Sequence, residues 1–392
     1  MTTTPLSTTL RIPTADRSLI THTMREPAVF EPHPAPFRSR SVYAAAHVVV
    51  DVRGDYQPGV QAPIDWESTI AFRKHLFSYG IGIAEAMDTS ERGELGLDWA
   101  QAKELIRYGN DAAREVGGAI VSGAGTDQLA TANPSLEEIV EAYIEQVEYV
   151  ESCGSAAVLR ASHALVGAAK NEDDYLEVYR RVLAKATKPV IVHWLGTVFD
   201  PSLRGYWGHE DLREAMRVVL TLLDANPAKI RGVKFSLLDD PFEQEFRALV
   251  PAGVEVFTGD DYGYTDLLLG DGKTHSHGLL GVLDPIGPIA SQAFAALDAE
   301  NEDRFRDVMN STIPFAVKMF EPPADRYKTG TVFIAWLSGH QSHFRQVSGR
   351  EGFRSIQHLT DLFVGADALG LFPDPDLAAH RMRTLLAVSG IE

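Results

Sequence analysis

Short apolar runs alternate with amphipathic segments between residues 43 and 300. The runs are nearly continuous, which is typical of strands that are buried on both faces of a parallel sheet. Eight runs are predicted to be strands: 44–52, 81–87, 118–122, 155–161, 189–194, 228–239, 254–258 and 279–283. Helical spacing of apolar residues marks the segments 65–79, 98–116, 135–153, 172–186, 209–225 and 264–269.

Eight strands that alternate with helices predict a (β/α)8 barrel, the TIM barrel of the α/β class. A doubly wound open sheet is the alternative, and it would place a glycine-rich phosphate loop after the first strand. The residues after that strand read Val52-Arg53-Gly54-Asp55 and do not form such a loop. The barrel is therefore the favoured fold.

The two ends of the chain differ from the middle. Residues 1–42 are rich in Thr, Pro and Arg, so they are expected to form an extension that wraps the body or a partner subunit, with a short strand at 8–12. Residues 301–392 carry helical spacing at 301–309, 313–320, 331–338, 352–363 and 376–389. We therefore predict an N-terminal extension (1–42), a barrel (43–300) and a C-terminal helical segment (301–392).

Composition narrows the class of protein. The chain has 392 residues and a net charge of -18, which argues against binding to nucleic acid or to an anionic membrane surface. Its single cysteine, Cys153, excludes an internal disulfide. The first residues lack the features of a signal peptide, and no apolar run is long enough to span a membrane. A cytoplasmic enzyme with a small-molecule substrate fits these observations.

One lysine, Lys234, stands inside the sixth apolar run. Lysine is rarely buried, because removing an ammonium from water is costly. Burial lowers the pKa of a lysine, and a neutral amine can attack a carbonyl and form a Schiff base. The alternative is a lysine that reaches solvent at the strand end or pairs with a carboxylate.

The sequence on either side of Lys234 resembles that of a known protein family. Four segments are similar to strand motifs of the dihydrodipicolinate synthase / N-acetylneuraminate lyase family. They are 189–193 (PVIVH) for the fifth strand, 230–234 (IRGVK) for the sixth, 257–261 (FTGDD) for the seventh and 281–288 (GVLDPIGP) for the eighth strand and its loop. The resemblance covers residues 43 to 380. It implies a class I aldolase or dehydratase without a cofactor or metal, in which Lys234 forms a Schiff base. It also implies a homodimer or homotetramer.

The sequence departs from the family pattern at three places. His193 stands where the family has a tyrosine that moves protons, and histidine can do the same work near neutral pH. In the loop that should hold a carboxylate, Thr89 and Ser90 offer hydroxyls but Asp88 adds a negative charge. The chain is also longer, by the extension and by the loop 196–207. The substrate class expected is a small keto acid or a sugar-derived keto compound.

The predicted catalytic residues are Lys234 as nucleophile and His193 as proton carrier, because catalytic side chains gather at the C-terminal ends of barrel strands. The predicted substrate-binding residues are Thr89, Ser90, Glu85, Arg160, Asp260 and Asp261. Several have structural alternatives. Arg160 could form an ion pair, and one of the two aspartates could cap the next helix.

Two other functions stay open at this point. A metal-dependent barrel enzyme, such as a sugar isomerase or hydrolase, would need a cluster of ligands at the barrel mouth. The pair His275 and His277 precedes the eighth strand, so we expect it at the opposite, N-terminal face. The third possibility is a non-catalytic ligand-binding protein on an aldolase scaffold.

Overall fold

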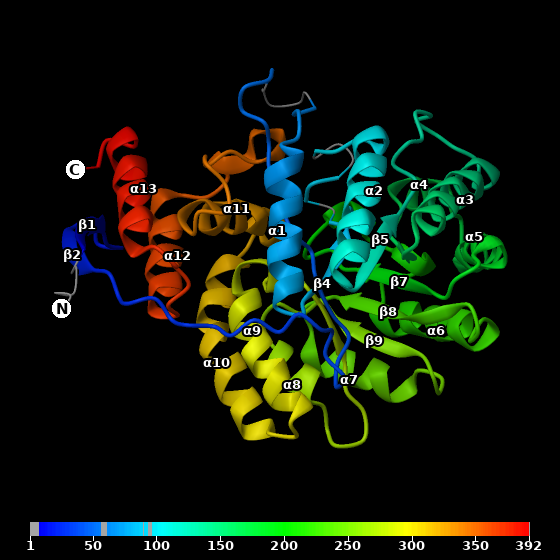
Figure 1. Cartoon of the computed structure of the whole chain (residues 1–392). Helices are drawn as coiled ribbons and strands as arrows, with labels where there is room; N and C mark the ends of the chain where they lie inside the picture. The colour runs from blue at the N-terminus through cyan, green and yellow to red at the C-terminus, as the bar shows by residue number, and fades with distance from the viewer. Residues whose placement is uncertain (1–7, 56–60, 89, 93–95, 392) are drawn as a thin grey trace.

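The computed structural model describes residues 8–55, 61–88, 90–92 and 96–391. Eight parallel strands close into a barrel in the order β10-β3-β4-β5-β6-β7-β8-β9. The strands are β3 (Val42–Ala44), β4 (Gly82–Glu85), β5 (Ile120–Ala124), β6 (Ala156–Leu159), β7 (Val190–Leu195), β8 (Ile230–Ser236), β9 (Glu255–Thr258) and β10 (His277–Leu280). The predicted TIM barrel is confirmed (Figure 1).

Helices follow the strands and cover the outside of the barrel (Figure 1). They are α1 (Trp66–Ser78), α2 (Trp99–Val116), α3 (Leu136–Cys153), α4 (His163–Ala168), α5 (Glu172–Lys185), α6 (Leu212–Ala225), α7 (Asp240–Leu249), α8 (Tyr264–Leu269) and α9 (Leu283–Asp298). Asp98 caps α2, and Ser135 with Glu138 forms a capping box on α3. Helices α4, α7 and α9 were not predicted: α4 is only six residues long, α7 has a proline in its first turn, and α9 contains Pro288 in its interior.

The predicted first strand is wrong in its extent. Strand β3 ends at Ala44, and the following buried residues lie outside the sheet. Their backbone N–H groups donate to side chains: His47 to Asp284 (2.7 Å), Val48 to Glu91 (3.2 Å) and Val49 to the Thr69 hydroxyl (3.0 Å). Because buried backbone groups need partners, these side chains replace the ladder that a strand would supply.

The C-terminal segment consists of helices, as predicted, and packs on the barrel. They are α10 (Glu302–Met319), α11 (Tyr327–Leu337), α12 (Ile356–Ala368) and α13 (Pro375–Val388). The segments 301–309 and 313–320 form one helix, α10, which contains Pro314. All residues of α11 are buried. Short 3₁₀ turns occur at η2 (Pro201–Leu203), η3 (Tyr206–Gly208), η4 (Ala324–Arg326) and η5 (Val347–Gly352).

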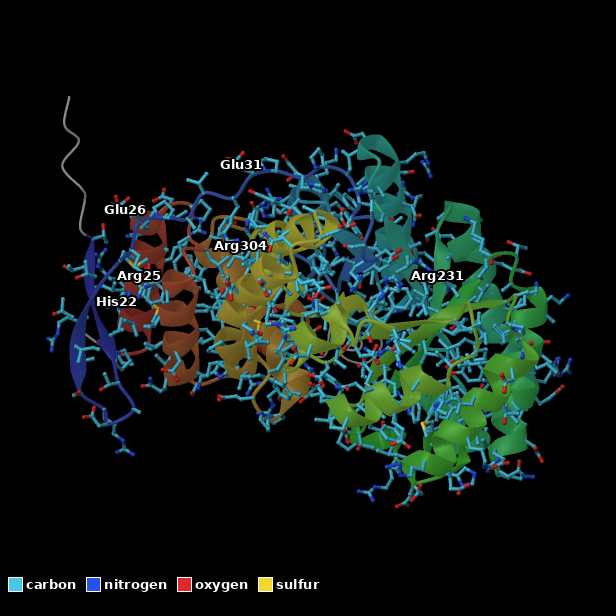
Figure 2. The ribbon with its side chains drawn as sticks, turned by 90° about the horizontal axis from the view of Figure 1, so that it is seen from below. His22, Arg25, Glu26, Glu31, Arg231 and Arg304 are labelled. Atoms are coloured by element: carbon cyan, nitrogen blue, oxygen red, sulfur yellow. The ribbon has the colours of Figure 1, made fainter. Side chains whose placement is uncertain are left out.

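The N-terminal extension lies on the chain's own C-terminal helices. Strands β1 (Thr9–Pro13) and β2 (Leu19–Thr23) form an antiparallel hairpin beside α12 and α13 (Figures 1 and 2). The His22 ring lies 2.9 Å from Asp367, and Arg383 donates to the carbonyl of Thr9 (2.7 Å). Among the described residues, no helix is long and apolar enough to cross a membrane.

Candidate active site

A small cavity opens where the strands of the barrel end. Its volume is about 30 Å³, close to the space of one water molecule. The lining residues are Ala45, Met87, Asp88, Ser90, His193, Leu195, Phe199, Lys234, Ser236, Gly259, Asp261, Gly281, Phe320 and Tyr327.

Lys234 reaches this cavity from the interior face of β8. The side chain is buried, and its amine lies 3.7 Å from the Met87 sulfur. A Cβ on Gly259 would overlap the Ser236 Oγ and lie 3.1 Å from the Lys234 Cε, so the glycine leaves room for both side chains. Burial lowers the Lys234 pKa to about 8, with a further contribution from the positive charge of Lys328. A useful fraction of this amine is neutral near pH 7.

His193 lies beside Lys234 on the neighbouring strand. The two residues are register partners in β7 and β8, and the His193 Nε2 atom lies 3.2 Å from the Ser236 hydroxyl oxygen. Its Nδ1 atom is buried and has no hydrogen-bond partner among the described residues. Burial lowers the His193 pKa far below its ordinary value, and the charges of Lys234 and Arg160 act in the same direction. The ring is therefore neutral at pH 7, and its Nδ1 atom is available for a hydrogen bond to a substrate.

Two carboxylates face the cavity in different protonation states. Burial raises the pKa of Asp261 to about 8, although the carboxylate accepts a hydrogen bond from the Val282 N–H (2.9 Å). Burial alone would raise the pKa of Asp88, but the positive charge of Lys328 and the hydrogen bond from the Tyr327 hydroxyl outweigh it and hold this pKa below its ordinary value. At pH 7 Asp261 can therefore donate a proton, and Asp88 carries a negative charge.

Two residues of the site come from α11 and were not predicted. The Tyr327 hydroxyl donates to Asp88, and the fully buried Lys328 ammonium lies 3.2 Å from Asp88 and 3.7 Å from Glu91. Burial lowers the pKa of Lys328, but the two carboxylates more than compensate, so its pKa is raised. The signal in the sequence was a Tyr-Lys pair three residues before the apolar run 332–337.

Comparison with known proteins places the chain in a family. A family model described as "Protein of unknown function (DUF993)" matches residues 10–391. The chain belongs to the DUF993 family. A search of curated proteins found no match.

Solved structures share the fold of the DUF993 chain. Dihydrodipicolinate synthase from Aquifex aeolicus superposes with a TM-score of 0.62 at 12% identity, covering 85% of this chain and 99% of that one. The enzyme of the same name from Thermotoga maritima gives 0.62 at 14%, covering 85% and 99%. The 4-hydroxy-tetrahydrodipicolinate synthase from Methylacidiphilum fumariolicum gives 0.60 at 14%, covering 88% and 99%. The predicted resemblance is confirmed at the level of the fold.

The other predicted binding residues of the DUF993 chain are divided between the cavity and its surroundings. Ser90 lines the cavity, and its hydroxyl donates to the carbonyl of Asp325 (3.0 Å). Thr89 lies outside the described residues. Arg160 donates to the carbonyl of Met87 (3.1 Å) and pairs with Asp127 (3.4 Å), beyond the cavity lining. Asp260 accepts the N–H groups of Tyr262 and Gly263, so it holds the turn before α8.

The expectation that Glu85 faces the barrel mouth is wrong. Alternate residues of a strand point to opposite faces. Ala84 belongs to the apolar cluster inside the barrel, and Glu85 points outward, where it meets α1 and α2. Its carboxylate accepts two hydrogen bonds from the fully buried Arg73, at 2.9 and 3.1 Å.

Glu85→Gln is therefore expected to destabilise the fold without affecting chemistry at Lys234. Removing one partner of a buried ion pair leaves the other charge uncompensated, at a cost of about 3–5 kcal/mol. Urea unfolding measures this cost. Glu115→Gln is the control, because its pair with Lys74 is solvent-exposed and contributes at most about 1 kcal/mol. Equal stability of the two variants would contradict the structural role of Glu85.

The His275 and His277 pair lies away from the cavity, at the N-terminal end of the eighth strand, although His277 belongs to that strand and does not precede it as predicted. His277 begins β10, accepts a hydrogen bond from the Ser41 N–H (3.0 Å) and lies 3.5 Å from Glu255, which begins β9. In the part of the chain that the structure describes, no group of three or more His, Cys, Asp or Glu residues is placed to hold a metal ion.

Proposed function

We propose that this DUF993 chain is a Schiff-base-forming lyase, aldolase or dehydratase that acts on a small keto compound through Lys234. The observation that carries the proposal is the buried Lys234 amine at the strand ends, with a pKa of about 8, beside a neutral histidine. Lysines with such lowered pKa values are the nucleophiles of imine-forming enzymes. The solved structures that share the fold are named as dihydrodipicolinate synthases.

The site groups divide the chemistry between them. The neutral Lys234 amine attacks the carbonyl carbon, and the resulting carbinolamine loses water with a proton from Asp261. In C–C cleavage the protonated imine accepts the electron pair of the breaking bond, His193 takes the proton of the substrate hydroxyl, and the same proton then returns to the carbon of the enamine to restore the imine. In dehydration the imine accepts the electron pair of a C–H bond whose proton goes to His193, and the enamine then expels the neighbouring hydroxyl, which leaves as water with that proton. Hydrolysis of the imine by water releases the product and restores the amine.

The charges around the amine favour a sugar-derived keto compound over a keto acid. The described cavity lining contains the ionised Asp88 but no arginine that could grip a carboxylate. The Ser90 and Ser236 hydroxyls and the Tyr327 phenol suit substrate hydroxyl groups instead. The cytoplasmic location and the homodimeric or homotetrameric assembly expected from the sequence remain predictions.

Borohydride reduction tests the proposal. The protein is incubated with a panel of 2-oxo acids and deoxy-keto sugars, reduced, and weighed by intact-mass spectrometry. A compound that is turned over should leave one reduced adduct per chain, because reduction converts the imine into a stable secondary amine. Turnover of any panel member without an adduct would exclude the imine mechanism.

His193→Gln is expected to separate imine formation from the later proton transfer. Loss of a general acid–base group slows turnover by roughly 10²–10⁴-fold, whereas the Lys234 amine should still form the reducible adduct. The measurement is kcat together with adduct yield after borohydride. His275→Gln, near the N-terminal ends of the strands, is the control. Unchanged kcat in His193→Gln would remove His193 from the mechanism.

A further inference from the structure

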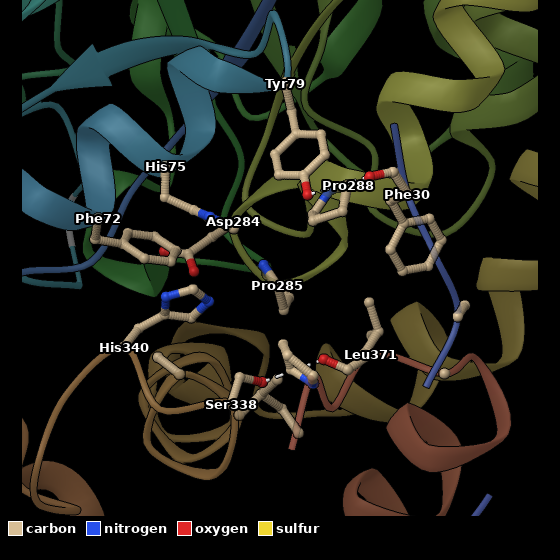
Figure 3. Close-up of a pocket in the computed structure, with 15 residues that line it drawn as sticks. Phe30, Phe72, His75, Tyr79, Asp284, Pro285, Pro288, Ser338, His340 and Leu371 are labelled. Atoms are coloured by element: carbon tan, nitrogen blue, oxygen red, sulfur yellow. Dashed lines mark hydrogen bonds between the residues drawn. The ribbon is translucent and has the colours of Figure 1, made fainter. Parts of the chain in front are cut away.

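A second cavity lies outside the barrel, between α1, α9, the end of α11 and the N-terminal extension (Figure 3). Its volume is about 140 Å³, similar to cavities that hold a benzene-sized molecule. It shares no lining residue with the cavity around Lys234. Its walls include the aromatic side chains of Phe30, Phe72 and Tyr79.

Two histidines face this cavity without hydrogen-bond partners. The rings of His75, on α1, and His340, after α11, lie with their centroids 4.4 Å apart. No hydrogen bond joins a ring nitrogen of either to another described residue, and both rings lie against aromatic neighbours. Burial lowers the pKa of His340 to about 3 and also lowers that of His75. Each neutral ring therefore offers one nitrogen that can accept a hydrogen bond.

The described cavity wall carries one acidic side chain, Asp284, and no basic residue other than the two histidines. Burial would raise the pKa of Asp284, but its contacts with His47 outweigh burial and lower the pKa, so the carboxylate is ionised. It is paired with His47 (2.9 Å), which lies outside the cavity lining. Figure 3 shows His75, His340 and Asp284 grouped on one side of the cavity, with Phe30, Pro288 and Leu371 on the other.

These features together define the chemistry of an occupant. Imidazole acceptors and a carboxylate attract a hydrogen-bond donor with positive charge, and aromatic faces stabilise a cation by about 0.5–2 kcal/mol each. An anion would meet no lysine or arginine in the described lining. The apolar wall opposite the histidines suits an apolar body of about the size of one ring.

We propose that this cavity is a binding site for a small organic ammonium with a compact aromatic or branched apolar body. The ammonium donates to His75 and His340 near Asp284, and the apolar body packs between Phe30 and Leu371. The proposal does not depend on the chemistry of Lys234.

Benzylamine is the probe, with benzyl alcohol and benzoate as neutral and anionic compounds on the same ring. Isothermal titration of the full chain should give saturable benzylamine binding with a Kd on the order of 1 mM, the range of a ligand with few atoms. Benzyl alcohol should bind about tenfold more weakly, because one charge-assisted contact is lost. Benzoate that binds as tightly as benzylamine would overturn the proposal, and so would absence of saturable benzylamine binding.

Two variants locate the site. His340→Leu removes an acceptor, and Ser338→Leu fills the cavity from α11's end. Each should weaken benzylamine binding at least about tenfold. His380→Leu, on the exposed face of α13, is the matched control and should bind as the unaltered chain does. Circular dichroism identifies which cavity variant is folded and informative. Unchanged affinity in a folded cavity variant would place the bound amine elsewhere and contradict the proposal.

Discussion

Lys234→Met is expected to lower turnover by at least about 10³-fold while the protein stays folded. Methionine has nearly the length of lysine and suits a buried strand, but it has no nucleophile. The reducible adduct should disappear together with turnover. The measurement is kcat and adduct mass for the variant and for Lys273→Met, which alters an exposed lysine in the turn before β10.

The stability of Lys234→Met distinguishes lost chemistry from lost structure. The folded pKa of about 8 lies below the ordinary value of 10.5, so the unfolded chain binds the proton more tightly. Folding is therefore penalised fully below pH 8, and the penalty fades as the pH rises from 8 to 10.5. The variant escapes this penalty, so its free energy of unfolding at pH 7 should be no lower than that of the unaltered chain. Full activity in a folded Lys234→Met protein would contradict the proposed role.

Lys328→Met is expected to be the most destabilising single change at the site. The ammonium is fully buried between Asp88 and Glu91 and donates to the carbonyl of Ala45. Its removal leaves two buried carboxylates without their cation, which costs about 3–5 kcal/mol. Urea unfolding measures the loss. Lys318→Met is the matched control, because its ion pairs with Glu321 and Asp361 are partly exposed and contribute at most about 1 kcal/mol.

The same variant should change the reactivity of Lys234. The positive charge of Lys328 lowers the pKa of Lys234, so removing it should raise that pKa and move adduct formation to higher pH. The pH profile of borohydride trapping, recorded at a temperature where the variant is folded, measures this shift. If Lys328→Met were as stable as Lys318→Met and its adduct formation had an unchanged pH profile, the proposed roles of Lys328 in stability and in lowering the Lys234 pKa would be wrong.

The barrel and the place of Lys234 could be predicted because strands buried on both faces leave continuous apolar runs. A lysine within such a run stands out from its apolar neighbours. Its position in the sixth of eight runs predicts that its side chain lies near the C-terminal ends of the barrel strands. The run 44–52 was wrongly predicted to be a strand throughout. A buried apolar segment whose N–H groups donate to Asp284, Glu91 and Thr69 has the same apolar pattern in sequence as a strand.

The wider site could not be predicted from local patterns. Glu85 is one residue from Ala84, and a shift of one position along a strand reverses the face to which a side chain points. Tyr327 and Lys328 are nearly 100 residues beyond Lys234, and only the packing of α11 on the barrel brings them to Asp88. Long-range packing of this kind leaves no spacing in the sequence.

The most direct test of the Schiff-base assignment is peptide mass spectrometry after borohydride reduction with a ketone that the protein turns over. The account predicts one adduct, on the peptide that contains Lys234, and no adduct in Lys234→Met. An adduct on Lys328, or turnover with an unmodified Lys234, would contradict it.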